Sequence, residues 1–293
     1  MASAFDAFLQ QAWADHADHA QVVAARLRSD TPAPESGAQI AALARFVVHL
    51  CGEHLGAFDD GRWRLAALVK HSRADAVALS TLRVGIASLS LAQNGAAARK
   101  GFTLEESIRS EAAAAAICVG RRDTGRGMSL LRAARERVAA LPDAGVAVHR
   151  PLAVACNNMA WDLNERGSER GAAETAAMLD IAAASKLHWA VAGTWLEVER
   201  ADYCIALCQL SAAQLDRALN AAAQCLAACT QNDAPVYEFF FAHEALARVQ
   251  HARGDASARA RHVDAAQAAF DKLPADDQEG CRATLAKLEA LGA

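Results

Sequence analysis

Residues 205–225 read IALCQLSAAQLDRALNAAAQC, and this stretch decides the fold. An apolar segment containing Ala206 leads into a turn near Ala213, and small residues then return at helical spacing at Ala218, Ala222 and Cys225. Small residues at these positions allow two helix backbones to pack closely, so the stretch predicts a helical hairpin. Ser211 and Gln214 have the spacing of a capping box at the start of the second helix.

Related turns occur at four other places in the chain. Each is preceded by a small residue on one predicted helix and followed by small and apolar residues on the next. The intervals between successive turns are about 41 to 66 residues, which is long for a helical repeat. The other turns lie near residues 55–61, 122–127, 160–167 and 247–255.

Helical periodicity extends through nearly the whole chain. Residues 1–30 predict one amphipathic helix with Ser3 and Asp6 spaced as a capping pair, and it ends in the proline-rich linker 29–37. Alanine makes up about a quarter of the chain, no segment alternates long enough to predict a strand, and we expect all six prolines outside the helices. Beyond the linker we expect helices at about 38–54, 59–71, 74–93, 104–119, 124–141, 148–165, 169–185, 188–210, 212–230, 235–252, 255–272 and 275–291.

The recurring hairpins resemble the tetratricopeptide repeat (TPR), over about residues 38–272. The resemblance implies an all-α fold, a right-handed α-solenoid of TPR-like hairpins preceded by the N-terminal helix. We expect 38–291 to form a single domain, or two subregions that meet near 142–151. The pairing of helices between 74 and 119 stays open. The resemblance also implies that the first helices of the hairpins line a concave groove in which ligands bind.

The predicted groove carries carboxamide, aromatic and charged side chains on three first helices. Their mixture of apolar and polar groups suits a peptide or protein segment. The alternative is that the asparagines satisfy backbone groups and that the tryptophan belongs to the core. Asn158 followed by Arg200 partly resembles the carboxylate clamp of chaperone-binding TPR domains. The candidate binding residues are Asn157, Asn158, Trp161, Asn164, Arg200, Tyr203, Phe241, Glu244 and Arg248.

Four cysteines form two pairs with i,i+4 spacing, and in an antiparallel hairpin the pairs face each other. Two cross-helix disulfides are therefore conceivable, but plain packing of small residues is the favoured interpretation. These residues are Cys204, Cys208, Cys225 and Cys229.

Two groups of metal-ligating residue types stand out, although neither matches a known motif. One group contains His16 and His19 with Asp15 and Asp18, and a His-x-x-His pair alone is a weak signal. The other contains His49, Cys51, Glu53 and His54. The chain has no His-Glu-x-x-His and no Glu-x-x-His sequence. We therefore expect neither a resident metal nor another cofactor.

Composition excludes several classes of function. A net charge of -4, with 30 basic and 34 acidic residues, gives no field that would attract nucleic acid. The arginine-rich turn at 120–127 lacks the features of a phosphate loop. No apolar run approaches the roughly 20 residues of a membrane span, and no export signal is visible, so we expect a cytoplasmic protein.

These observations predict a noncatalytic scaffold or adaptor of bacterial type that binds a protein or peptide segment in its groove. One alternative is a sensor domain that encloses a small molecule or signal peptide near Trp195 and His243, in a cluster of aromatic and titratable residues. A thiol-redox or metal-dependent enzyme is a further alternative, without a recognisable nucleophile arrangement. The sequence does not determine the partner or the oligomeric state.

Overall fold

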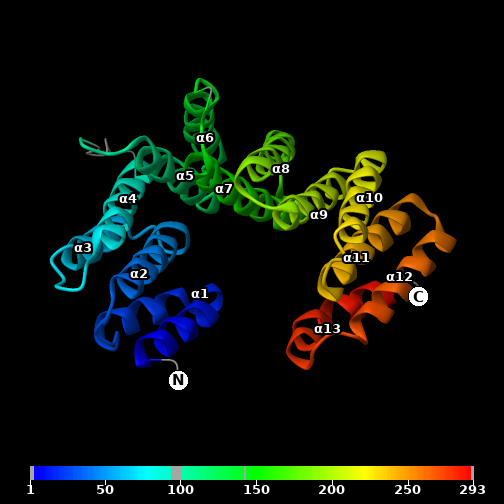
Figure 1. Cartoon of the computed structure of the whole chain (residues 1–293), viewed down its shortest axis with the longest axis horizontal. Helices are drawn as coiled ribbons and strands as arrows, with labels where there is room; N and C mark the ends of the chain where they lie inside the picture. Colours follow the sequence, from blue (N-terminus) through cyan, green and yellow to red (C-terminus); the bar gives the residue numbers. More distant parts are fainter. Residues whose placement is uncertain (1–2, 94–99, 142, 292–293) are drawn as a thin grey trace. The chain divides into compact units, whose positions relative to one another are not determined.

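The computed structural model describes residues 3–93, 100–141 and 143–291, and these residues form helices and their connections (Figure 1). The prediction of an all-α chain is confirmed, since no strand occurs in the described part. Within it, no helix combines the length and apolarity that crossing a membrane requires. The chain divides into two compact units, Met1–Ala155 and Cys156–Ala293. The division falls inside a helix, just beyond the 142–151 stretch that the alternative of two subregions gives as their junction.

The first unit contains seven helical elements and the beginning of an eighth. Each α-helix from α2 to α5 contacts the next α-helix along the chain, and α2 also contacts α4. The elements are α1 Ala4–Ser29, α2 Gly37–His49, the π-helix η1 Leu50–His54, α3 Phe58–Leu68, α4 Ala76–Ala92, α5 Leu104–Gly120, α6 Thr124–Ala139 and α7 Val146–Glu165.

The second unit begins within α7 and continues to the end of the described chain. Consecutive helices from α8 to α13 contact each other, and α11 also contacts α9 and α13. Its further elements are the 3-10 helix η2 Gly167–Glu169, α8 Ala172–Ala192, α9 Trp195–Ser211, α10 Leu215–Gln231, α11 Val236–Arg253, α12 Ala256–Phe270 and α13 Ala275–Ala290.

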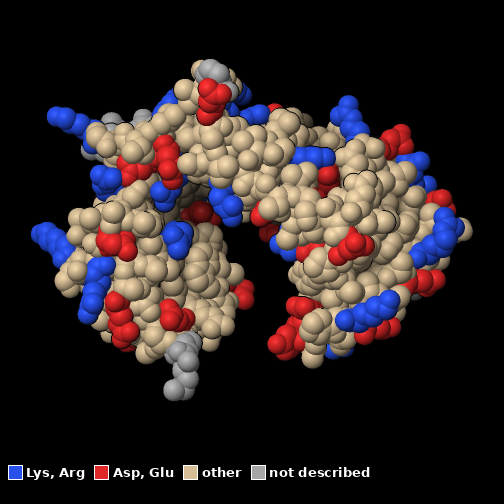
Figure 2. Space-filling model, viewed as in Figure 1, with Lys and Arg blue, Asp and Glu red and all other residues tan. Residues whose placement is uncertain are grey.

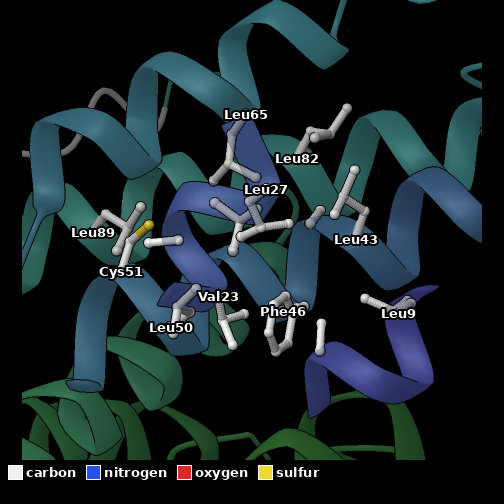
Figure 3. Packing of buried hydrophobic residues seen from close by; sticks show 14 of the residues in the cluster. Leu9, Val23, Leu27, Leu43, Phe46, Leu50, Cys51, Leu65, Leu82 and Leu89 are labelled. Atoms are coloured by element: carbon white, nitrogen blue, oxygen red, sulfur yellow. The ribbon is translucent and has the colours of Figure 1, made fainter. Parts of the chain in front are cut away.

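The core of the first unit is built from large aliphatic and aromatic side chains (Figure 3). Phe46, Leu50 and Leu65 are fully buried, and α1 contributes Leu9 and Val23 to the same cluster. Burying such side chains contributes roughly 1.5–3 kcal/mol each. The N-terminal helix is therefore part of this core. The backbone of α1 departs from helical geometry at His19, where φ is -132° and ψ is 37°.

Small residues fill the core of the second unit at the predicted positions. Ala206 and Ala222 are fully buried in one cluster, which joins α9 to α10, and Ala247 and Ala266 are fully buried in another, which joins α11 to α12. Because alanine adds only a methyl group to the helix surface, the backbones can approach closely. This observation confirms the small-residue interpretation of the turns near residues 213 and 254.

Local capping chemistry explains most helix ends and corrects some expectations. The capping box of Ser3 with Asp6 is confirmed, and Thr103 forms another with Glu106. The capping box predicted at Ser211 is wrong, because Gln214 is the N-cap of α10 and Ser211 ends α9. Ala213 takes φ of 57° in that turn.

The predicted end of α8 and the predicted start of α9 are also wrong. α8 does not end near residue 185 but runs on to Ala192, and α9 begins after Thr194, whose side chain forms a capping box with Glu197. Pro151 lies inside α7, although we expected every proline outside the helices. The predicted continuous helix 38–54 is divided, since its last five residues form the π-helix η1.

Candidate functional site

Three helices of the second unit bring aromatic rings into one continuous series. The ring of Trp161 on α7 lies 5.8 Å from that of Tyr203 on α9, and Tyr203 lies 5.6 Å from Phe241 on α11, as measured between centroids. Tyr237 extends the series, with its ring 4.9 Å from that of Phe241. All four side chains are half-buried, so each retains an exposed part. We call Trp161, Tyr203, Phe241 and Tyr237 the aromatic row.

A buried carboxylate holds the centre of the row in place. The Tyr203 hydroxyl donates a hydrogen bond to Glu244 Oε2 at 3.0 Å, and Arg248 Nη1 donates to Glu244 Oε1 at 3.0 Å. The Glu244 side chain is 3% exposed, whereas that of Arg248 is 43% exposed. Burial raises the pKa of Glu244, and the hydrogen bonds and charge of its partners oppose that rise. Burial likewise raises the pKa of Tyr203, so its hydroxyl remains a donor.

A second carboxylate positions another arginine near the end of the row. Arg200 on α9 donates from Nε to Glu238 Oε2 at 3.2 Å, and its Nη2 donates to the other carboxylate oxygen. The Glu238 side chain is 6% exposed and that of Arg200 is 56% exposed. The hydrogen bond to Glu238 raises the pKa of Arg200. The charge of Arg200 also interacts with Tyr237. Such a forked pair fixes the plane of the guanidinium group.

The asparagines of the predicted groove differ in their surroundings. Asn158 is exposed and Asn157 is half-buried, so neither is sealed in the interior. The Asn164 side chain accepts a hydrogen bond from the Ser211 hydroxyl at 2.6 Å, which joins the end of α7 to the end of α9. The Asn164 carboxamide thus bonds within the fold to a side-chain hydroxyl, not to the backbone groups that the alternative interpretation names. Arg200, the second member of the suggested clamp, is committed to Glu238.

A buried acid and two thiols lie between α9 and α10. Glu199 is 1% exposed, and its Oε1 accepts from the thiols of Cys225 at 2.7 Å and Cys229 at 3.5 Å. Among the described residues, Glu199 Oε2 has no hydrogen-bond partner. Burial is the main reason why the pKa of Glu199 is raised. This carboxyl group, unlike Glu238 and Glu244, has no guanidinium bonded to it.

The four cysteines of α9 and α10 carry free thiols in place of the two conceivable disulfides. Cys204 Sγ lies 4.0 Å from Cys208 Sγ on the same helix. The hydrogen bond between these two thiols, together with burial, raises the pKa of Cys204. The hydrogen bond with Cys229, together with burial, raises the pKa of Cys225. Since the thiolate is the reactive form, this arrangement is that of inert, packed cysteines.

Trp195 and His243, which suggested a small-molecule pocket, contact different residues. Trp195 packs against the cluster of Cys225 and Cys229. His243 on α11 lies next to His262 on α12, with 3.1 Å between their Nδ1 atoms. Burial, followed by the charge of His262, lowers the pKa of His243. Trp195 and His243 thus make contacts with different partners in the second unit.

The arginine-rich turn contacts the chain around it. Arg121 Nη1 donates to the backbone oxygen of His54 at 3.1 Å, and Arg126 binds the backbone oxygen of Leu91. Farther along α6, Arg137 Nη1 binds Glu111 at 2.6 Å. On the face seen in Figure 2, basic and acidic side chains are interspersed. This pattern is that of a solvated surface without one dominant sign of charge.

Tyr237 is the member of the row that sequence reasoning missed. It lies four residues before Phe241, and residues with this spacing share a helix face. The sequence also gave no indication of a shallow cavity of about 350 Å³ between α8, α9 and α10, where Lys186 Nζ binds the buried Asp202 at 2.6 Å.

No family model, curated protein or solved structure matches this chain. The resemblance to tetratricopeptide repeats therefore depends on the residues of the chain itself.

Proposed function

We propose that the second unit binds a protein or peptide segment in which acidic side chains flank apolar ones. The observation that carries this proposal is the pair of exposed arginines, Arg200 and Arg248, each anchored by a buried carboxylate at the aromatic row. Each guanidinium group has five N–H donors, so donors remain for a ligand after the internal bonds are made. The proposed role is that of a noncatalytic scaffold or adaptor.

The half-buried rings supply the apolar part of the proposed surface. Tyrosine, tryptophan and arginine are the residues that most often dominate binding energy at protein interfaces. Here the rings pack against one another, and two arginines are held by hydrogen bonds before any ligand arrives. Such preorganisation lowers the entropy lost on binding.

The arrangement of helices supports the finer part of the proposal, that the second unit is a right-handed solenoid of TPR-like hairpins. Consecutive helices pack together, and α9 also contacts α11, as first helices of neighbouring repeats do. In such a solenoid α7, α9 and α11 are first helices, and these three carry Trp161, Tyr203 and Phe241.

The test begins with selection of peptides from a displayed random library on the full chain. We expect the selected sequences to be enriched in Asp and Glu beside aromatic or aliphatic residues. A synthetic consensus peptide then gives Kd values by fluorescence anisotropy. The expected affinity falls with increasing salt, because exposed charges are screened.

Arginine-to-lysine variants separate binding from folding. Arg200→Lys and Arg248→Lys keep a positive charge on the buried carboxylates but remove the forked donors. We expect each variant to weaken binding of the consensus peptide by about 10–150-fold, since a hydrogen bond to a charged group contributes roughly 1.5–3 kcal/mol. Arg217→Lys is the matched control, because Arg217 is exposed and donates a hydrogen bond to Gln214 instead of to a buried carboxylate. Unchanged affinity in both lysine variants, or peptides without acidic enrichment, contradicts the proposal.

A further inference from the structure

Three histidines of the first unit converge on one point. His49 Nε2 lies 3.0 Å from His16 Nε2 and 3.1 Å from His54 Nε2, and one ring nitrogen of each residue lies within 4.8 Å of the others. We call His16, His49 and His54 the histidine cluster. His16 comes from the first group of metal-ligating residues in the sequence, and His49 and His54 come from the second. His19 and Cys51 do not belong to it.

The π-helix is the reason why His49 and His54 share a face. In an α-helix a residue five positions on lies about 140° around the axis, and the two side chains diverge. In a π-helix the hydrogen bond joins residues five apart, as it does from Leu55 N to Leu50 O at 3.0 Å, and the side chains align. Gly52 allows α5 to pack against this segment, because a Cβ atom there would lie 2.9 Å from the Ile117 side chain.

Hydrogen bonds at the opposite ring nitrogens orient two of the three imidazoles. His16 Nδ1 lies 2.6 Å from the backbone oxygen of Trp13, and His49 Nδ1 lies 3.0 Å from Glu53 Oε2. A carbonyl oxygen and a carboxylate only accept, so both Nδ1 atoms carry the proton. When neither Nε2 carries a proton, their lone pairs face each other at 3.0 Å and repel unless a proton or a metal cation lies between them.

The geometry points to a binding site for a divalent transition-metal cation of the zinc class, with His16, His49 and His54 Nε2 as ligands. Nitrogens bound about 2.0–2.1 Å from one zinc ion at angles of roughly 90–110° are about 2.9–3.4 Å apart. The two short separations in the cluster fall within this range. A protein ligand set of three histidines leaves a further position for water or another small ligand.

The surroundings favour nitrogen ligation and support the site. The thiol of the nearby Cys51 is buried in the core and does not belong to the cluster. The Trp13 ring stacks on His49 at 5.1 Å, and Phe46 packs against Trp13 at 4.8 Å. Histidines that bind metals commonly have such carbonyl or carboxylate partners at the second nitrogen.

The site would connect α1 with α2 and η1. His16 lies three residues before the irregular backbone at His19, and the other two ligands lie on the α2–η1 segment. A bound cation therefore stabilises the packing of α1, because it binds the folded arrangement and not the separated helices. This inference is independent of the peptide-binding proposal for the second unit.

The experiment titrates Zn²⁺ into the untagged full chain, freed of metal by chelation and dialysis, with a chromophoric chelator as competitor. We expect one Zn²⁺ per chain at this site and a higher Tm in its presence. His16→Ala, His49→Ala and His54→Ala should each weaken binding by more than about 100-fold, beyond the roughly 10–100-fold expected when a supporting residue is lost. Glu53→Gln keeps all three ligands and should weaken binding by about tenfold, which tests the site without removing a ring.

Two control variants are available in the same chain. His19→Ala removes an exposed histidine of α1 outside the cluster, and His243→Ala breaks the His243–His262 pair of the second unit. Both should retain tight Zn²⁺ binding. Substitution of Co²⁺ for Zn²⁺ should give visible d–d bands without the near-ultraviolet charge transfer of a thiolate ligand. A thiolate band would place the metal at cysteine and overturn the inference. Zn²⁺ affinity that is absent, or equal in the wild type and all three alanine variants, overturns it as well.

Discussion

The histidine cluster of the first unit and the aromatic row of the second unit have opposite electrostatic character. In the cluster, two imidazole Nε2 atoms lie 3.0 Å apart, which is suited to a bound cation. In the row, buried carboxylates are paired with arginines, and the guanidinium groups remain partly exposed. The first arrangement is proposed to bind a cation, whereas the second presents cations to an anion.

The buried acids of the second unit show how the hydrogen-bond partners of a carboxyl group affect its charge. Glu238 and Glu244 bind guanidinium groups, and these pairs position exposed charges. Glu199 is buried to a similar degree but binds thiols, and burial raises its pKa. Burial of a carboxylate thus has different consequences according to whether a cation accompanies it.

The largest effect is expected from Phe46→Ala. Phe46 is fully buried and packs against Trp13, so its loss leaves a cavity beneath the histidine cluster. We expect the free energy of unfolding to fall by about 3–5 kcal/mol. Urea denaturation followed by circular dichroism measures this loss, with the half-buried Phe102→Ala as the control of smaller effect. A loss below about 1 kcal/mol would show that the cluster does not depend on this core.

An intermediate effect is expected from Glu199→Gln, as a change in pH dependence. Because the pKa of Glu199 is raised in the folded state, the folded chain binds more protons than the unfolded chain at pH values above its ordinary pKa. Wild-type stability should therefore decrease as pH rises from the unfolded pKa through the folded one. The residue's contribution to this decrease, roughly 1–3 kcal/mol for a buried unsatisfied group, should be missing in the variant.

Denaturation of both proteins at several pH values measures the difference in slope. The exposed Glu165→Gln is the control, and it should reproduce the wild-type slope. Equal slopes for wild type and Glu199→Gln would show that Glu199 has no raised pKa, and would remove its contrast with Glu238 and Glu244.

The smallest effect is expected from Tyr203→Phe. The ring stays in the aromatic row, but Glu244 Oε2 loses the hydroxyl that donates at 3.0 Å. The expected loss of stability is about 0.5–1.5 kcal/mol. Tyr237→Phe serves as the matched control, with an expected change within about 0.5 kcal/mol. Equal changes in the two variants would mean that the buried carboxylate does not hold the row.

The aromatic row was largely predictable because it follows helical periodicity. Trp161, Tyr203 and Phe241 were placed on exposed faces of successive first helices, and their rings meet in the structure. The role of Asn164 was not predictable, since it depends on Ser211, which is 47 residues away in the sequence. The prediction of the end of α8 is wrong because it does not take into account the Thr194 capping box, which marks the start of α9.

The histidine cluster was not predictable from spacing. The sequence grouped His16 with His19, and His49 and His54 with Cys51 and Glu53, because spacing reveals only near neighbours along a helix. Five residues of regular α-helix would have separated His49 from His54. Only the π-helix aligns these two, and only the packing of α1 on the same core brings His16 to them.

The amino-acid sequence by itself determined an all-helical chain, most of its helices and the small residues at which they pack. These properties depend on neighbours a few residues apart, where periodicity and propensity act directly. The tertiary structure alone decided which polar atoms meet: three imidazole nitrogens in the first unit, and arginines on buried carboxylates in the second. Such encounters depend on the rotation and depth at which each helix packs, and these are set by the shapes of side chains distant in the sequence.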